Sequence, residues 1–511
     1  MYLHPTDSAE ISSILKDLND SAAGNDDINI KVVKLSAHNY VNVLVHLVNL
    51  SLSQGKIPDE LKIAKVIPLY KSGDEQLTNN YRPISILPCF SKIFEKIIYN
   101  RIFSFISEHN ILYKYQFGFR KNHNTTIALI TLIDRILMGF NDGNFTLGVF
   151  LDYSKAFDTI NHSILLDKLF NYGIRGIAHH LITDYLTNRK QFVEYNSVLS
   201  SHKDISCGVP QGSILGPLLF LLYINDIYTI SDSLMPILFA DDCNVFIQGP
   251  NLEEIVNKMN SELKSIKLWI DCNQLSLNIN KTQYMIFANR KYNMLNIPSI
   301  NICDENLTRV NSVKFLGFLI DEKISWVDHI HYIQKKIAKG IGIIHRARQF
   351  LKRKTLLTLY NCFILPYLTY GLEVWGSATQ SNIKALLTLQ KKALRIITFS
   401  SYLSPSWPLF QSLHLLPIDK LYQTKLFIFM YKVNRLLYPY TVTQMFIQNQ
   451  DIHLLNTRYK SLYRIPMFRT VKLQRNIRYR GVICFNSLSN IIDYNCSIYT
   501  LKKRLKEYFL I

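Results

Sequence analysis

The chain has 511 residues, 48% of them hydrophobic and 19% charged, which is enough for one large multi-lobed body or for two to three folded domains. This composition excludes a disordered or fibrous protein. The first ten residues lack a signal-peptide pattern and no apolar run reaches the length of a bilayer span, so we expect an intracellular chain with no membrane partner. Eight cysteines are scattered singly, as is typical of reduced thiols rather than of a zinc site.

The net charge of +20 is unevenly distributed along the chain. From Lys335 to Ile511 there are 28 Lys and Arg against 5 Asp and Glu, a net charge of +23, whereas the first 334 residues have 30 against 33, a net charge of −3. Within the C-terminal part, cations and aromatic residues alternate in one block: Tyr459, Lys460, Tyr463, Arg464, Phe468, Arg469, Arg475, Arg478, Tyr479 and Arg480. The block suits phosphate neutralisation with base stacking, although a solvated basic surface or a membrane-surface patch has the same composition.

Apolar periodicity in the first 140 residues predicts four helices, at 8–23, 36–53, 91–108 and 124–140. Between the second and the third helix, Val66–Tyr70 and Arg82–Leu87 are typical strands. The turn-rich residues between them predict a hairpin.

The middle of the chain alternates short strands with helices, which predicts an α/β or α+β fold. The expected strands are Leu147–Leu151, Met235–Ala240, Val245–Ile247, Tyr284–Phe287 and Val313–Leu319, and the expected helices are Ile214–Tyr223 and 252–271. After Ser325 the pattern becomes helical and basic, so we expect a boundary near 320–325.

Two of these strands end on acidic residues. Asp152 follows Leu151, and Asp241 and Asp242 follow Ala240. Either site alone would be interpreted most simply as a turn-forming or capping carboxylate. Together they offer three hard oxygen ligands, which a pair of Mg²⁺ ions needs when substrate phosphates complete the coordination. Such a pair can activate a hydroxyl and stabilise the leaving oxygen in phosphoryl transfer.

A glycine-containing turn, Gly208–Ser213, lies between the two acidic sites. Its glycines would let the backbone approach a planar base pair closely, with Gln211 presenting an amide. A plain loop before a helix has the same pattern.

Eight segments follow one another in a recognisable order: Ile67–Asp74, Asn80–Ser85, Gln116–Arg120, Leu151–Asp158, Val209–Ser213, Phe239–Asp242, Leu277–Thr282 and Phe315–Gly317. In this order the chain resembles the reverse transcriptase of non-LTR retrotransposons, the group that includes jockey-like and CR1-like elements. The resemblance is close over roughly 60–320 and looser from about residue 8 to the end.

The resemblance implies an α+β right-hand polymerase with fingers, a palm of antiparallel sheet plus helices, a helical thumb and a basic, mostly helical C-terminal region. We therefore expect an N-terminal helical extension at 1–50, fingers and palm at 51–321, a thumb at 322–400 and the basic region at 401–511.

The resemblance also implies the residues that bind metal. Asp152 and Asp241 would be metal ligands together with the Tyr153 carbonyl, and Asp242 would complete the catalytic trio. The implied cofactor is a pair of Mg²⁺ ions, for which Mn²⁺ could substitute.

The remaining expected roles concern the nucleotide and the primer. The resemblance implies that Lys71 and Arg82 grip the triphosphate and that Gln211 and Gly212 contact the nucleotide. It also implies that Lys281 protonates the pyrophosphate and that Phe157 is a steric gate against ribose. The primer grip that it implies is formed by Phe315, Leu316 and Gly317. Phe157 could instead be a core aromatic residue, and Lys281 a solvated lysine.

The implied partners are an RNA template, a DNA primer and deoxyribonucleoside triphosphates, with the nucleus as the site of action. We expect endonuclease activity to be supplied elsewhere or lost, because the family carries that domain upstream and this chain starts too late to hold it. Residues 22–27 depart from the family's usual turn, and Cys484 and Cys496 lack the neighbours of a zinc knuckle.

Three other interpretations compete with this one. An RNA-dependent RNA polymerase is disfavoured by Phe157 and by the Pro-Gln-Gly turn at 210–212. A group II intron maturase and a catalytically dead RNA-binding remnant stay open as alternatives.

Overall fold

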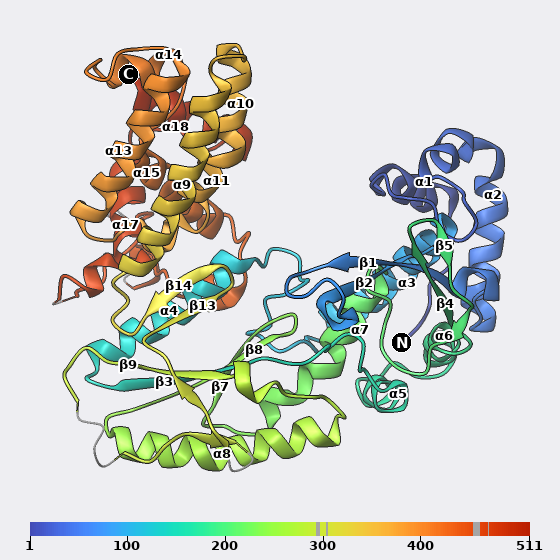
Figure 1. Ribbon diagram of the computed structural model, residues 1–511. Helices are drawn as coiled ribbons and strands as arrows, with labels where there is room; N and C mark the ends of the chain where they lie inside the picture. Colours follow the sequence, from blue (N-terminus) through green and yellow to red (C-terminus); the bar gives the residue numbers. More distant parts are fainter. Residues whose placement is uncertain (293–296, 303–304, 453–459, 469) are drawn as a thin grey trace.

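The computed structural model describes residues 1–292, 297–302, 305–452, 460–468 and 470–511, and its architecture is mixed α+β (Figure 1). Two main sheets lie within the first 320 residues, and the chain after them is helical. The expected α+β class is therefore confirmed. Of the basic block, Tyr459 and Arg469 lie outside the described residues.

Two helices begin the chain, and both differ in length from the prediction. α1 (Ser8–Asp17) starts at an Asp7 cap but stops well before residue 23, because Leu18 is extended and its carbonyl accepts a hydrogen bond from the Lys34 side chain. α2 (Ile30–Gln54) starts earlier than expected, since Asn29 caps it by accepting from the Lys31 N–H.

The first sheet is built on the predicted hairpin of β1 (Ile63–Tyr70) and β2 (Tyr81–Ile86). β1 also pairs in parallel with β4 (Lys190–Tyr195), which carries the two-residue strands β5 (Val198–Leu199) and β6 (Lys203–Asp204). We did not predict β4 to β6: β5 and β6 are two-residue strands and show no periodicity, and β4 has only one buried residue, Phe192, to mark it. The helices α3 (Cys89–Glu108), α5 (His162–Asn171) and α6 (Ile177–Leu186) lie at the same end of the molecule as this sheet (Figure 1).

The second sheet lies at the centre of the molecule, with the strand order β12-β9-β3-β8-β7. Its strands are β3 (Phe145–Leu151), β7 (Met235–Phe239), β8 (Asp242–Gly249), β9 (Gln283–Phe287) and β12 (Thr308–Arg309), antiparallel except for the β12–β9 pair. α4 (Thr125–Asn141) covers one face, and α7 (Leu215–Ile224) and α8 (Leu252–Cys272) cover the other (Figure 1). Successive β8 side chains point to opposite faces, so Phe246 packs with α4 and Val245 with α7 and α8.

Two short hairpins follow: β10 (Asn301–Ile302) with β11 (Glu305–Asn306), and β13 (Ser312–Phe315) with β14 (Phe318–Asp321). The single strand expected at Val313–Leu319 is therefore wrong. Leu316 and Gly317 have φ angles of 47° and 87° and turn the chain back.

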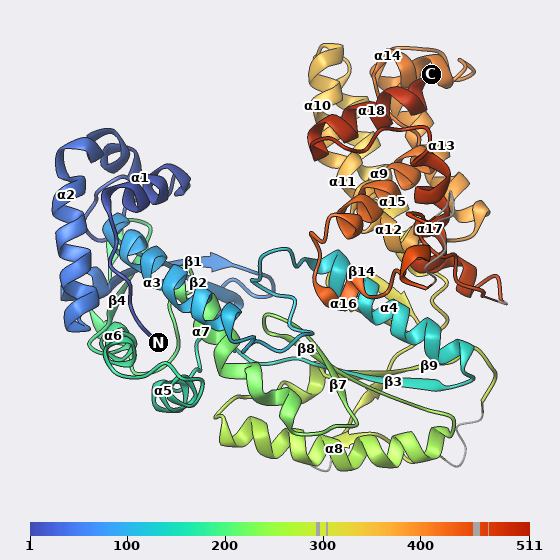
Figure 2. The same ribbon diagram turned by 180° about the vertical axis from the view of Figure 1, so that it is seen from behind.

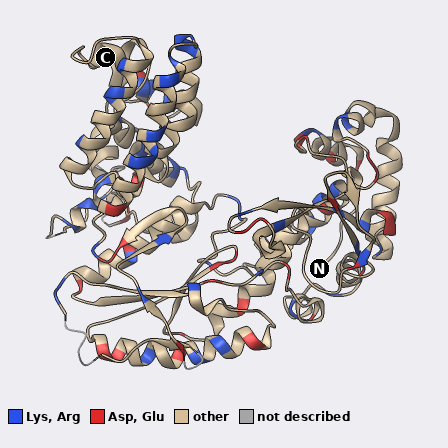
Figure 3. Cartoon of the chain, in the orientation of Figure 1, with Lys and Arg blue, Asp and Glu red and all other residues tan. Residues whose placement is uncertain are grey.

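The rest of the chain is helical from α9 (Val327–Ala347) onward, close to the expected boundary near 320–325. The other helices are α10 (Arg353–Phe363), α11 (Leu365–Thr369), α12 (Leu372–Trp375), α13 (Gln380–Ile397), α14 (Trp407–Ser412), α15 (Ile418–Asn434), α16 (Tyr440–Thr443), α17 (Ile477–Leu488) and α18 (Ile498–Leu510). In both views these helices rise from the face of the central sheet that α4 covers, and α1 and α2 lie at the opposite end of the molecule (Figures 1 and 2). Lysines and arginines are spread over the C-terminal helices with few acids among them (Figure 3). The division into four domains stays a prediction.

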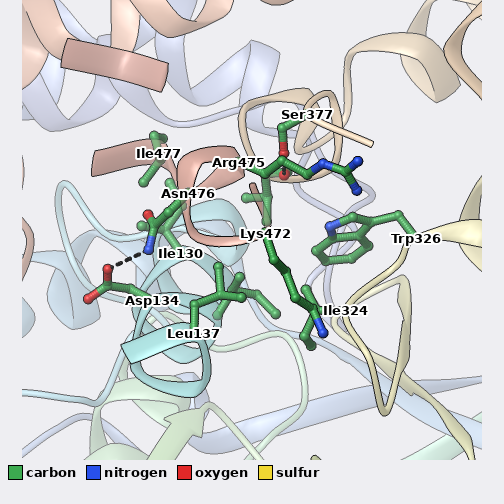
Figure 4. Close-up of a pocket in the computed structure, with 12 residues that line it drawn as sticks. Ile130, Asp134, Leu137, Ile324, Trp326, Ser377, Lys472, Arg475, Asn476 and Ile477 are labelled. Atoms are coloured by element: carbon green, nitrogen blue, oxygen red, sulfur yellow. Dashed lines mark hydrogen bonds between the residues drawn. The ribbon is translucent and has the colours of Figure 1, made fainter. Parts of the chain in front are cut away.

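An ion pair and a hydrogen bond fasten the C-terminal region to the helix that covers the sheet, and Figure 4 shows the hydrogen bond, between Asp134 and Asn476. Asp134 of α4 is only 3% exposed and accepts hydrogen bonds from Asn476 Nδ2 at 2.9 Å and Arg478 Nη2 at 2.6 Å. Asn476 also caps α17. Arg478, which we expected among phosphate-neutralising cations, is therefore paired with a carboxylate of the protein itself.

No helix in the described part of the chain combines the length and the apolarity that crossing a membrane requires.

Candidate active site

The three candidate carboxylates meet at one end of the central sheet. β3 and β8 are antiparallel neighbours, with Leu151 paired to Cys243, so Asp152 lies one residue beyond the last pair and opposite Asp242. Asp241 lies in the tight turn between β7 and β8, where Ala240 has a φ angle of 55° and Phe239 pairs with Asp242. Side chains directly opposite one another on paired strands lie about 5 Å apart at Cβ. The sheet therefore gathers the residues that the sequence separates by about ninety positions.

Negative charge accumulates at this end of the sheet. Asp241 and Asp242 are exposed, yet the protein around Asp242 and the charges of Asp241 and Asp152 raise the pKa of Asp242 to about 6. Within the described residues, no group of three or more His, Cys, Asp or Glu side chains is close enough to hold a metal by itself. Carboxylates are the ligands that a divalent ion prefers when substrate oxygens complete its coordination, and metal binding by these three residues stays a prediction.

A turn from the next part of the chain fixes the backbone of Asp152. The Asp152 carbonyl accepts from the Asn278 N–H at 2.7 Å, and its own N–H donates to Thr282 Oγ1 at 3.4 Å. Thr282 is fully buried. Lys281 ends the 3₁₀ turn Ile279–Lys281 and is exposed, so its role in protonating a leaving group stays a prediction.

Tyr153 follows Asp152 and bridges to Leu277. Its hydroxyl is buried without a hydrogen-bond partner in the described residues, and burial raises its pKa far above the ordinary value. The role of the Tyr153 carbonyl as a metal ligand stays a prediction.

The hairpin that carries Asp241 and Asp242 is braced by residues 115–118. Phe117 N–H donates to the Leu238 carbonyl at 2.8 Å, and the buried Gln116 Oε1 accepts from the N–H groups of Gly118 and Ala240 at 2.9 and 3.3 Å. Gly118 lies so close that a Cβ added there would be 2.2 Å from the Ala240 nitrogen. The sequence pattern alone predicts no role for this segment. It sets the position of the acidic turn.

The loop that contains Gln211 and Gly212 is wedged against β2. Ser85 N–H donates to the Gln211 carbonyl at 2.8 Å, and a Cβ added at Gly212, whose φ angle is 132°, would be 2.4 Å from the Ser85 oxygen. The Gln211 amide, which we expected to face a nucleotide, donates to Asp158 Oδ1 at 2.8 Å. Contact of Gln211 with a nucleotide stays a prediction.

A buried acid that sequence reasoning missed supports the same loop. Glu95 of α3 is 1% exposed and accepts from Ile214 N–H, at the start of α7, at 2.6 Å and from Tyr185 Oη at 2.8 Å. Burial raises its pKa, while the Ile214 hydrogen bond and the buried Arg189 oppose that shift. The available signal was an acid on the apolar face of α3, between Ile93 and Ile97.

Lys71 and Arg82 are exposed and lie on one face of the β1–β2 hairpin. Arg82 pairs with Leu69, and Lys71 is two residues beyond Leu69 on the same face. Lys155, three residues after Asp152, donates through Nζ to Asn79 Oδ1 at 3.0 Å. This bond ties the hairpin turn to the acidic segment.

Phe157 is half-buried and stacks on Phe220 of α7 with ring centroids 4.3 Å apart, with Phe119 edge-on at 6.3 Å. This position is compatible with both alternatives, a sugar gate and a core aromatic residue, so the gate stays a prediction.

The tip of the β13–β14 hairpin, where a primer grip was expected, is held by Tyr370, whose hydroxyl donates to the Leu316 carbonyl at 2.8 Å. Gly317 packs against the same tyrosine ring.

Three carboxylates at the ends of adjacent antiparallel strands, with exposed cations on a nearby hairpin, are the groups that metal-dependent phosphoryl transfer requires. The comparison with known proteins agrees with this class: residues 69–320 match the family described as "Reverse transcriptase (RNA-dependent DNA polymerase)". Residues 69–320 therefore belong to the reverse transcriptase family.

Three relatives from Drosophila melanogaster indicate the branch of the family. The chain is 28% identical to "Probable RNA-directed DNA polymerase from transposon X-element" over 78% of its own length and 44% of the relative's. It is 29% identical to "Probable RNA-directed DNA polymerase from transposon BS", over 71% and 41%, and 28% identical to "RNA-directed DNA polymerase from mobile element jockey", over 74% and 42%. The chain thus spans less than half the length of these relatives. The resemblance to non-LTR retrotransposon reverse transcriptases is confirmed, and the maturase alternative is not favoured.

Proposed function

We propose that the chain is an RNA-directed DNA polymerase of a non-LTR retrotransposon, which extends a DNA 3′-hydroxyl on an RNA template. The observation that carries the proposal is the convergence of Asp152, Asp241 and Asp242 at one end of a sheet within the matched family region. In this proposal the β1–β2 hairpin belongs to the fingers, the central sheet with α4, α7 and α8 forms the palm, and the helices from α9 onward form the thumb and the basic C-terminal region.

The same proposal assigns two Mg²⁺ ions, or Mn²⁺ in their place, to the three carboxylates. Bound ions would supply Lewis-acid stabilisation of the attacking and leaving oxygens. Burial, together with repulsion from Asp241 and Asp152, raises the pKa of Asp242, and this supports the assignment because a bound cation would offset the repulsion. Lys71 and Arg82 then bind the triphosphate as long, exposed cations on one face of their hairpin, and the β13–β14 tip contacts the primer strand.

Primer extension tests this function directly. Purified chain, an RNA template annealed to a DNA primer, the four deoxyribonucleoside triphosphates and Mg²⁺ should give products that grow to the template end. Omission of the template or addition of a chelator is the control, and full-length products under either condition would contradict the proposal. A chain that binds the primer–template without extending it would support the RNA-binding remnant instead.

A further inference from the structure

A cavity lies among the C-terminal helices, remote in sequence from the carboxylates. Its volume is about 430 Å³, within the range of roughly 300–1,000 Å³ that is usual for small-ligand sites. The lining comes from α12, α13, α15 and α17, from the loop between α12 and α13, and from the 3₁₀ turn Leu473–Arg475 before α17. Helices α15 and α17 lie side by side here (Figures 1 and 2).

Apolar side chains and one aromatic ring form the inner part of the cavity. Leu372, Ile418 and Leu426 are almost fully buried and line it together with Tyr422. The Tyr422 hydroxyl is buried and has no hydrogen-bond partner in the described residues. An aromatic residue with an unsatisfied hydroxyl suits a flat ligand that carries polar groups at its edge.

Two cations stand at this cavity without a partner. Arg475 and Arg480 both line it, and the side chain of neither forms a hydrogen bond or an ion pair with a described residue. This distinguishes them from Arg478, on the same segment, which Asp134 neutralises. Two unneutralised guanidinium groups are suited to a phosphate.

The remaining polar groups match the edges of a nucleotide. Ser377, Thr379 and Ser487 provide hydroxyls, and the amides of Gln380 and Gln423 can donate and accept. Asp419 also lines the cavity, and a carboxylate there accepts from base N–H groups. Proteins bind RNA in this way when they stack an unpaired base on an aromatic or guanidinium plane and read its edges.

We propose that this cavity captures one unpaired nucleotide of a single-stranded RNA, with the base against Tyr422 and the phosphate between Arg475 and Arg480. The proposal rests on the proposed function, since it names a site for the RNA that the polymerase copies. It places a specific contact within a region whose net charge of +23 otherwise attracts any polyanion.

Three variants of the full chain separate the cavity from general charge. Ser487→Trp fills the mouth of the cavity from an exposed position on α17 and leaves the charge unchanged. Arg480→Ala removes a cavity cation, and Arg464→Ala removes an exposed cation that does not line the cavity. Melting temperatures establish that each variant folds.

Affinity for an unstructured, fluorescein-labelled RNA 12-mer is measured by anisotropy at fixed salt. We expect Ser487→Trp to weaken binding about tenfold, because one stacked base is lost. Arg480→Ala should weaken it several times more than Arg464→Ala. A wild-type affinity for folded Ser487→Trp, or equal losses for the two arginine variants, would overturn the proposal. Equal losses on a DNA 12-mer would overturn its assignment to RNA.

Photo-crosslinking with a 4-thiouridine 12-mer provides an independent readout. The crosslink should map to 471–488 or to Tyr422 and disappear in Ser487→Trp, and a crosslink confined to other segments would overturn the proposal. Extension of a pre-annealed primer–template is measured in parallel. If extension fails while the binding pattern holds, the polymerase function is wrong and the cavity assignment stands; the reverse result refutes the cavity alone.

Discussion

Gly118 offers a test of how the acidic turn is positioned. Its backbone lies against the turn between β7 and β8, and a Cβ added there would be 2.2 Å from the Ala240 nitrogen and 3.0 Å from the Phe239 carbonyl carbon. Since ordinary contact begins at 3.4 Å, Gly118→Ala must separate the two backbones by about 1.2 Å. Both partners are backbone, so no flexible side chain can absorb the movement.

This displacement predicts two separate effects. Overpacking of this kind costs about 1–3 kcal/mol of the free energy of unfolding. A displacement of about 1 Å at reacting groups costs about 100-fold in rate, so primer extension should fall by that factor because Asp241 and Asp242 move relative to Asp152. Steady-state extension on an RNA template and urea denaturation measure the two effects on the same preparation.

Gly342→Ala is the matched control. Gly342 lies within α9, and an added Cβ there meets nothing within 4 Å. The same substitution should leave extension unchanged and stabilise the helix by up to about 1 kcal/mol. If Gly118→Ala retains wild-type activity while folded, the inference that this segment positions the carboxylates is refuted.

Three further outcomes are expected. Phe157→Val should admit ribonucleotides if the ring is a sugar gate, measured as the ratio of ribonucleotide to deoxyribonucleotide incorporation; unchanged discrimination in a folded variant would leave it a core aromatic. Glu95→Ala should lower the free energy of unfolding by about 1–3 kcal/mol, since it leaves the buried Ile214 N–H and the Tyr185 hydroxyl without their acceptor; a loss below 1 kcal/mol in urea would contradict this. Without divalent ions, Asp242→Asn should stabilise the chain above pH 6, by about 1 kcal/mol after solvent screening. Because the pKa of Asp242 is raised in the folded state, ionisation of Asp242 destabilises that state. The extra stability of Asp242→Asn should therefore shrink as the pH falls from about 6 toward 3.8. A stability difference between variant and wild type that does not change with pH would rule this explanation out.

Local sequence patterns predicted the elements that carry the carboxylates. The strands ending at Asp152 and before Asp241 were found because each is a short apolar run bounded by polar residues, and the β1–β2 hairpin was found from its turn residues. Helix ends were less predictable, as at α1, where the backbone becomes extended at Leu18 and the Leu18 carbonyl accepts from the Lys34 side chain.

Contacts between residues distant in sequence could not be predicted. Nothing in the sequence indicates that Glu95 meets Ile214, or that Gly118 meets Ala240, since both pairs are more than a hundred residues apart. The pairing of Arg478 with Asp134 could not be predicted either, because the number of charged residues in a segment does not show which cation has an acidic partner.

Asp241→Asn tests the central claim most directly. The substitution removes one carboxylate charge from an exposed turn and little of the surface that would hold nucleic acid. Primer extension on an RNA template with Mg²⁺ is measured beside the affinity for the same primer–template. The account predicts that extension is abolished while affinity stays nearly unchanged, and extension within a few-fold of the wild-type rate would contradict it.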